Sequence, residues 1–154
     1  MSTPSPDAPA RHPAAARAGR VLPRRQAAGA AGIDAVLVVV FAAIGRASHQ
    51  ETHPVLGVLA TAWPFLVGAA LGWLLVRAWR APLRLWPIGV AVWAVTVTGG
   101  MLLRAATGNG TATAFIVVAT ITLAVFLLGW RAMAALTRRL SARGAGSHPK
   151  ENPL

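Results

Sequence analysis

Four apolar stretches dominate this sequence, at about 27–45, 55–76, 85–103 and 111–130, and Asp34 is the only charged residue inside any of them. An α-helix needs about 20 apolar residues to cross the roughly 30 Å hydrocarbon core of a bilayer. The three later stretches meet this length unaided. The first meets it only if its helix begins in its Ala- and Gly-rich start, which places the Asp34 carboxylate inside the membrane. The stretches therefore predict an all-α integral membrane bundle of four transmembrane helices.

The overall composition supports a membrane protein over a soluble one. The 154 residues are 55% hydrophobic and only 12% charged, yet the formal net charge is +11. A soluble domain of this length carries a larger share of charged residues on its surface. A basic excess is also typical of nucleic-acid binding, but here the charges lie in short flanks between the apolar stretches. We therefore expect anionic lipid headgroups as partners and no nucleic acid. Fourteen Arg against one Lys favours a GC-rich bacterial genome.

The basic residues predict the topology. Five precede the first stretch, three lie between the second and third, and five follow the fourth, whereas only Arg46 and Arg104 lie on the other side. Basic residues close to span ends are retained in the cytoplasm during insertion. The sequence thus predicts a multi-pass protein of the cytoplasmic membrane with both termini inside. So uneven a distribution also argues against a protein that inserts in both orientations.

The flanking segments lack the apolar content of a folded core. Residues 1–26 are rich in Pro, Ala and Arg, and we expect a disordered basic cytoplasmic tail. Residues 131–143 place apolar side chains on one helical face and predict an amphipathic interfacial helix. Residues 144–154 are expected to be disordered.

Asp34 is the first candidate functional residue, because a carboxylate inside a membrane is costly and by default suggests a function. One hypothesis is a protonatable or ion-coupled site, and the other is a structural ion pair with an interfacial arginine. Arg104 ends the third span on the far side, about 28 Å from the cytoplasmic end, whereas Asp34 lies about 10 Å from that end at 1.5 Å per residue, so we expect no direct pair between them. Arg77, Arg84 and Arg131 flank the cytoplasmic ends and could reach it.

The outer loop, 46–54, holds a second group of polar residues. His49 and His53 are four residues apart with Glu51 between them, and imidazole and carboxylate groups can bind divalent metals. A solvated polar loop, in which Glu51 neutralises Arg46 or Arg104, is the favoured interpretation, so we expect no metal. Together with Asp34, the candidate polar residues are Arg46, His49 and Arg104.

Small residues in the spans predict close helix packing. Gly68 and Gly72 are four apart in the second span, and Gly100 lies in a similar pattern in the third. Such spacing allows another helix to approach closely. Pro64 removes a backbone hydrogen bond in the second span and predicts a kink.

A weak internal repeat links the two halves of the chain. The triplet Leu-Gly-Trp occurs at 71–73 and again at 128–130, and Arg46 and Arg104 close the two outward spans. A duplicated helical hairpin and a chance match both explain it.

By position, we expect Trp130 at the cytoplasmic membrane interface, where indole rings are favoured.

Several stretches occur together in an order that resembles a known family. They include Asp34 leading into 41–49, Thr61 to Gly68 followed by Gly72-Trp73, residues 86–89 and 96–104, and Gly129-Trp-Arg131. The set resembles the domain of unknown function 3054 family of small four-helix bacterial and archaeal membrane proteins, over about residues 30–135. The resemblance implies a four-span membrane protein and no particular activity, ligand or catalytic residue.

No pattern for catalysis is visible. The chain has no cysteine, no phosphate-binding loop and no pair of carboxylates at a useful spacing. We therefore expect no enzyme and no cofactor. Two function hypotheses stand: small-solute or ion- or proton-linked permeation with Asp34 as its polar site, and a non-transporting scaffold or accessory subunit that binds a partner through glycine faces and basic tails. A homo-oligomer and a second membrane protein are the partners considered.

Overall fold

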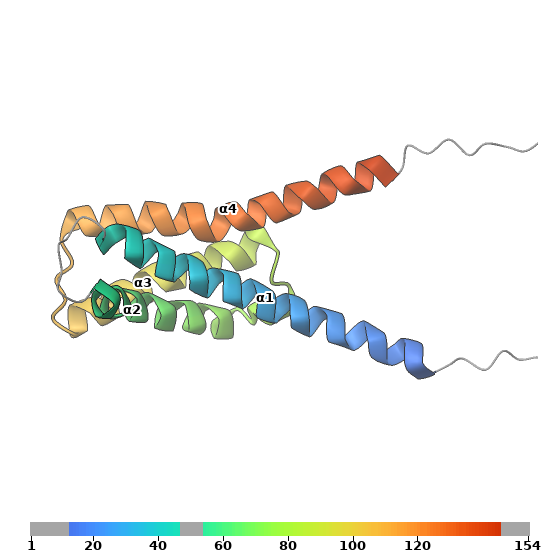
Figure 1. The fold of residues 1–154 in the computed structure, drawn as a ribbon, viewed down its shortest axis with the longest axis horizontal. Helices are drawn as coiled ribbons and strands as arrows, with labels where there is room; N and C mark the ends of the chain where they lie inside the picture. The colour runs from blue at the N-terminus through green and yellow to red at the C-terminus, as the bar shows by residue number, and fades with distance from the viewer. Residues whose placement is uncertain (1–12, 47–53, 146–154) are drawn as a thin grey trace, which may run out of the picture.

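The computed structural model describes residues 13–46 and 54–145, and within these ranges the chain is entirely helical, without strands. Four long helices form a bundle, shown in Figure 1: α1 (Pro13–Arg46), α2 (Pro54–Leu75), α3 (Val90–Ala106) and α4 (Thr113–Ala145). The connection between α2 and α3 contains two short helical turns, η1 (Ala78–Arg80) and η2 (Leu85–Gly89). Four helical segments are long and apolar enough to cross a membrane, and the third of them, Leu85–Ala106, joins η2 to α3.

Helices α1 and α4 are much longer than the bundle needs. They contain 34 and 33 residues, about 50 Å each at 1.5 Å per residue, against a hydrocarbon core of roughly 30 Å. Both extend beyond the bundle at the same end, where α2 and α3 are also joined (Figure 1). We call this the tail end, and the opposite end, where α1 stops and α3 turns into α4, the hairpin end. The chain therefore enters and leaves the bundle at one end.

Helix α1 begins at Pro13, well before the expected start near Ala27, so residues 13–26 are helical where a disordered tail was predicted. Proline is favoured in the first turn of a helix, and alanine and arginine are strong helix formers. The prediction weighed the lack of apolar side chains and neglected this propensity. The remaining predicted tail residues, 1–12 and 146–154, lie outside the described ranges. Residues 131–143 continue α4 without interruption.

Helices α2 and α3 pack closely along the glycines that the sequence singled out. A Cβ atom added to Gly68 would lie 2.7 Å from the backbone oxygen of Thr96, and one added to Gly72 would lie 3.1 Å from that of Val92. On α3, a Cβ at Gly100 would overlap the Phe65 ring. Larger residues at these positions would push the helices apart. Helix α2 continues through Pro64, and a kink there stays a prediction.

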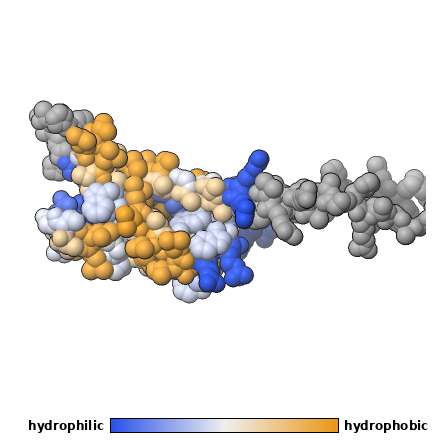
Figure 2. All heavy atoms as spheres, turned by 90° about the horizontal axis from the view of Figure 1, so that it is seen from below, coloured by the Kyte–Doolittle hydropathy of each residue, from blue (hydrophilic) through white to orange (hydrophobic). Residues whose placement is uncertain are grey.

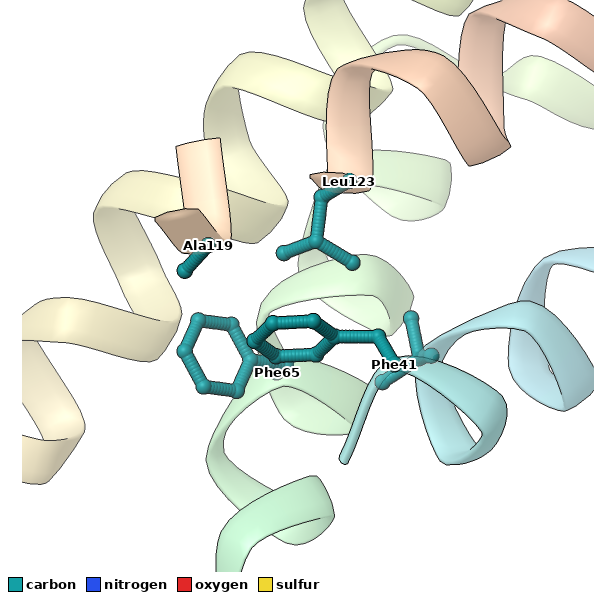
Figure 3. Packing of buried hydrophobic residues seen from close by; sticks show 5 residues of the cluster. Phe41, Phe65, Ala119 and Leu123 are labelled. Atoms are coloured by element: carbon teal, nitrogen blue, oxygen red, sulfur yellow. The ribbon is translucent and has the colours of Figure 1, made fainter. Parts of the chain in front are cut away.

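Aromatic and aliphatic side chains fill the centre of the bundle. Phe41 and Phe65 meet edge to face with ring centroids 5.3 Å apart, and Ala119 and Leu123 of α4 pack against them (Figure 3). Such edge-to-face pairs are favourable for aromatic rings. This cluster joins α1, α2 and α4.

The outer surface of the bundle is apolar. Leucine, isoleucine and valine side chains on all four long helices are more than half exposed, among them Ile44, Leu74, Leu102 and Val125. Figure 2 shows hydrophobic residues along the body of the bundle and strongly hydrophilic residues gathered at the tail end. A surface of this kind suits contact with lipid tails, because it would be unfavourable in water.

Candidate functional site

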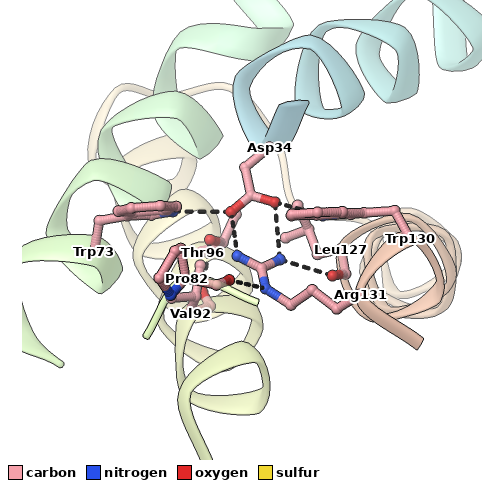
Figure 4. A network of polar contacts seen from close by, with 8 residues as sticks. All are labelled: Asp34, Trp73, Pro82, Val92, Thr96, Leu127, Trp130 and Arg131. Carbon is pink, nitrogen blue, oxygen red and sulfur yellow. Dashed lines mark hydrogen bonds and ion pairs between the residues drawn. The ribbon is translucent and has the colours of Figure 1, made fainter. Parts of the chain in front are cut away.

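Asp34 lies in the middle of a buried polar network near the tail end, where it forms an ion pair with Arg131 (Figure 4). The two side chains are 1% and 0% exposed. Arg131 Nη1 donates to Asp34 Oδ1 at 2.8 Å, and Nη2 donates to Oδ2 at 2.6 Å. This two-pronged geometry matches a planar guanidinium to a planar carboxylate and is the strongest form of the contact.

Two tryptophans complete the shell around the carboxylate. Trp73 Nε1 donates to Asp34 Oδ2 and Trp130 Nε1 donates to Oδ1, each at 2.8 Å. Each carboxylate oxygen therefore accepts two hydrogen bonds, which uses the four acceptor sites that a carboxylate offers. The Trp130 ring also lies 4.7 Å from the guanidinium carbon of Arg131, within the range of a cation–π contact.

The remaining donors of Arg131 hold the backbone around it. Nη1 also donates to the Leu127 carbonyl at 2.8 Å, and Nε donates to the Pro82 carbonyl at 3.2 Å. Gly89 makes room for the arginine stem, since a Cβ added there would lie 2.8 Å from Arg131 Cδ. The network thus joins α1, α2, α4 and the connection between α2 and α3. We call it the Asp34 network.

This arrangement is suited to holding the bundle together. A buried ion pair offsets the cost of removing two charges from solvent only when its geometry is good and its other polar atoms are bonded. Both conditions are met at Asp34. Because every acceptor site of the carboxylate is occupied, a proton could bind Asp34 only after one of these hydrogen bonds broke. The geometry therefore favours the structural ion pair over the ion-coupled site.

The sequence identified Asp34 and offered three arginines as partners, of which the structure selects Arg131. It did not identify the two tryptophans, and Trp130 was expected at the membrane interface instead. The internal repeat could have indicated these tryptophans, because Trp73 and Trp130 end the two Leu-Gly-Trp triplets. In the structure each of them donates to a different carboxylate oxygen of Asp34.

The other candidate polar residues lie apart from this network. Arg46 and Arg104 come together at the hairpin end, where they line one small cavity. His49 lies outside the described residues, as does His53. Within the described ranges, no group of three or more His, Asp or Glu side chains could hold a metal ion. Thr96 and Thr120 donate to carbonyls of their own helices and so contribute no polar path between helices.

A cavity of about 700 Å³ lies at the tail end, beside the Asp34 network. We call it the tail-end cavity. Its wall is formed by the connection between α2 and α3, by Gln26 of α1 and by α4. Four arginines and two tryptophans line it: Arg80, Arg84, Arg138, Arg139, Trp79 and Trp86. Pro82, whose carbonyl binds Arg131, is part of the same wall.

A second, apolar cleft of about 410 Å³ lies between α1 and α2. Ala31, Ala35 and Ala69 form its sides, and Asp34 and Trp73 reach its wall. The small side chains account for the open space between the two helices.

Comparison with known proteins agrees with the resemblance seen in the sequence. The family described as "Protein of unknown function (DUF3054)" matches residues 31–134, about two thirds of the chain. No curated protein and no solved structure matches this chain. The matched region includes both members of the ion pair and both tryptophans that bind Asp34. The chain therefore belongs to the DUF3054 family.

Proposed function

We propose that this protein is a multi-pass component of the cytoplasmic membrane, with both termini inside, that binds the headgroup of an acidic phospholipid in the tail-end cavity. It would act as a non-transporting accessory protein. The observation that carries the proposal is the lining of that cavity, in which four arginines and two tryptophans surround about 700 Å³.

The chemistry of this lining suits a phosphate group next to a membrane surface. Arginine binds phosphate oxygens through two parallel hydrogen bonds, and indole rings favour the boundary between lipid tails and water. Basic pockets between membrane helices on the cytoplasmic side bind acidic headgroups. The volume falls within the range of 300–1,000 Å³ that is typical of ligand sites.

The charge of the surroundings supports an anionic ligand. Asp34 is the only acidic residue within the described ranges, and Arg131 neutralises it. The arginines of the cavity therefore have no acidic side chain of the described part to pair with. The arginines of the described residues support the cytoplasmic location, because all of them except Arg46 and Arg104 lie toward the tail end.

Permeation through Asp34 is less well supported. A coupling carboxylate must exchange protons or ions, and all acceptor sites of Asp34 are occupied by donors. Proton flux into reconstituted vesicles that is abolished by Asp34→Asn, in a variant that stays folded, would contradict the proposal.

The direct test measures lipid binding by the full-length protein. Purified protein is placed in nanodiscs of phosphatidylcholine with or without cardiolipin, and retained lipid is quantified by native mass spectrometry. We expect preferential retention of cardiolipin, weakened about tenfold by Arg84→Gln, since one charge-assisted hydrogen bond contributes roughly 1.5–3 kcal/mol.

The matched control is Arg143→Gln. Arg143 is an exposed arginine of α4 outside the cavity lining, so its loss removes the same charge from the same end of the bundle. Retention should change little in this variant. An equal loss in both variants, or no preference for cardiolipin, would show that only general surface charge attracts lipid.

A further inference from the structure

The hairpin end of the bundle contains a second basic cavity, independent of the first. Its volume is about 160 Å³, and every one of the four long helices contributes to it. We call it the hairpin-end cavity. Its lining consists of Phe41, Gly45, Arg46, Thr61, Arg104 and Phe115.

Hydrogen-bond donors converge on this space. Arg46 Nη1 donates to Thr61 Oγ1 at 3.1 Å, and because that oxygen is the acceptor, the Thr61 hydroxyl still has its own hydrogen to donate. Thr61 is only 5% exposed. Arg104 Nη2 donates to the Gly110 carbonyl at 3.3 Å. Arg104 Nε is buried and meets no hydrogen-bond partner among the described residues.

The aromatic walls fix the position of the arginine. The guanidinium carbon of Arg104 lies 4.4 Å from the centroid of the Phe115 ring, a distance at which a cation is attracted to a ring face. Phe41 forms part of the wall and also belongs to the packed core. The guanidinium is therefore placed by packing before any ligand arrives, which lowers the entropy cost of binding.

The charges at this cavity do not balance. Two guanidinium groups line it, and the only described acid, Asp34, is paired with Arg131 near the other end. Glu51 is the one acidic residue of the sequence between α1 and α2, and a single carboxylate neutralises one of the two charges at most. Counting the described residues and Glu51 together, the two arginines of the cavity therefore keep a net positive charge. Arginines on this side also run against the bias that keeps basic residues in the cytoplasm.

The volume limits the size of the ligand. A cavity of about 150 Å³ accommodates a molecule the size of benzene, so a nucleotide or a sugar phosphate would not fit. We infer that the hairpin-end cavity binds the phosphate group of a small oxyanion, held by Arg104, Arg46 and the Thr61 hydroxyl. That group could belong to free phosphate or to a lipid headgroup whose remainder stays outside the cavity.

The experiment titrates inorganic phosphate into full-length protein in lipid-free, uncharged detergent and measures binding by calorimetry at constant ionic strength. We expect a saturable site that persists in Arg84→Gln, a variant in which any phosphate binding by the tail-end cavity is weakened. Arg104→Gln should weaken it about tenfold or more, because one charge-assisted interaction is lost. Arg143→Gln, at the other end of the protein, should leave it unchanged. If Arg104→Gln fails to fold, Arg104→Lys keeps the charge without the planar fork and should also weaken binding.

Two further arms identify the source of the anion. Binding that persists in nanodiscs of phosphatidylglycerol supports free phosphate as the ligand. Binding seen in detergent but blocked in those nanodiscs supports a lipid phosphate in the same site. Absence of saturable binding in detergent, or equal binding by Arg104→Gln and the native protein, overturns the inference. Binding that appears only in Glu51→Gln also overturns it, because Glu51 would then be the anion that the cavity holds.

Discussion

Replacing Arg131 with methionine would remove the partner of Asp34 and leave a buried carboxylate held by two indole donors alone. Methionine is similar in length to the arginine stem and fills irregular gaps, so the change removes the charge while largely keeping the packing. The variant therefore isolates the energy of the Asp34 network.

The structure sets the size of the effect. Two charge-assisted hydrogen bonds to Asp34 are lost, and at about 1.5–3 kcal/mol each their sum is about 3–6 kcal/mol. Breaking a buried ion pair from one side costs about 3–5 kcal/mol for the same reason. The Leu127 and Pro82 carbonyls also lose a donor. We expect Arg131→Met to lower the free energy of unfolding by about 3–5 kcal/mol.

The assay is equilibrium unfolding in mixed micelles, monitored by helical circular dichroism and by tryptophan fluorescence. It is run on the native protein, Arg131→Met, Asp34→Leu and the double variant. Each single variant leaves one buried charge unpaired, whereas the double variant leaves none. The double variant should therefore be more stable than either single one, although it lacks the ion pair altogether.

Additive losses in the four-way comparison would refute this reasoning, because they would mean that Asp34 and Arg131 contribute separately. A loss below about 1 kcal/mol in Arg131→Met would refute it as well, since a loss so small is typical of exposed ion pairs. Either result would reopen a role for Asp34 in proton or ion exchange.

Two other changes test the tryptophan shell and the helix packing by the same unfolding assay. Trp73→Phe removes one donor to the Asp34 carboxylate and should lower the free energy of unfolding by about 1.5–3 kcal/mol. The control is Trp63→Phe, at a partly exposed indole without a hydrogen bond to the described residues, and it should change stability by less than about 0.5 kcal/mol. Similar losses in both variants would contradict the role of Trp73 as a donor to Asp34. Gly68→Ala places a Cβ 2.7 Å from the Thr96 carbonyl and should cost about 1–3 kcal/mol. Gly32→Ala meets nothing within 4 Å and should be neutral or stabilising by up to about 1 kcal/mol, so a loss equal to that of Gly68→Ala would show that close packing is not the cause.

The sequence predicted the helices well because membrane insertion depends on length and hydropathy, which are local properties. The four apolar stretches correspond to the four helices that could span a membrane. The start of α1 was missed because residues 13–26 form a helix through alanine and arginine propensity, without an apolar face to reveal it. The packing glycines were visible as a spacing, although only the structure shows that Gly68 faces Thr96.

The Asp34 network was only half predictable, for a geometric reason. Membrane depth excluded Arg104 and retained three arginines at the correct level, since rise per residue can be counted along a helix. Choosing among the three requires the rotation of each helix about its axis, and hydropathy does not define that rotation in helices that are apolar on all sides. The two tryptophans were missed for the same reason: their depth matched that of an interface residue, and only their direction distinguishes them.

The ion pair and the tail-end cavity are mechanically connected through one carbonyl group. Arg131 Nε binds the Pro82 oxygen, and Pro82 lies in the wall between the arginines that face the cavity. Gly89, which gives the Arg131 stem its room, ends η2 on the other side of the same connection. The segment that carries Arg80 and Arg84 is therefore anchored to Arg131, a buried side chain that is itself paired with Asp34. A rigid anchor keeps these arginines in place although solvent reaches them, and rigid placement is what a headgroup site requires. Under the proposed function, the buried charge of Asp34 would therefore support headgroup binding without touching the headgroup.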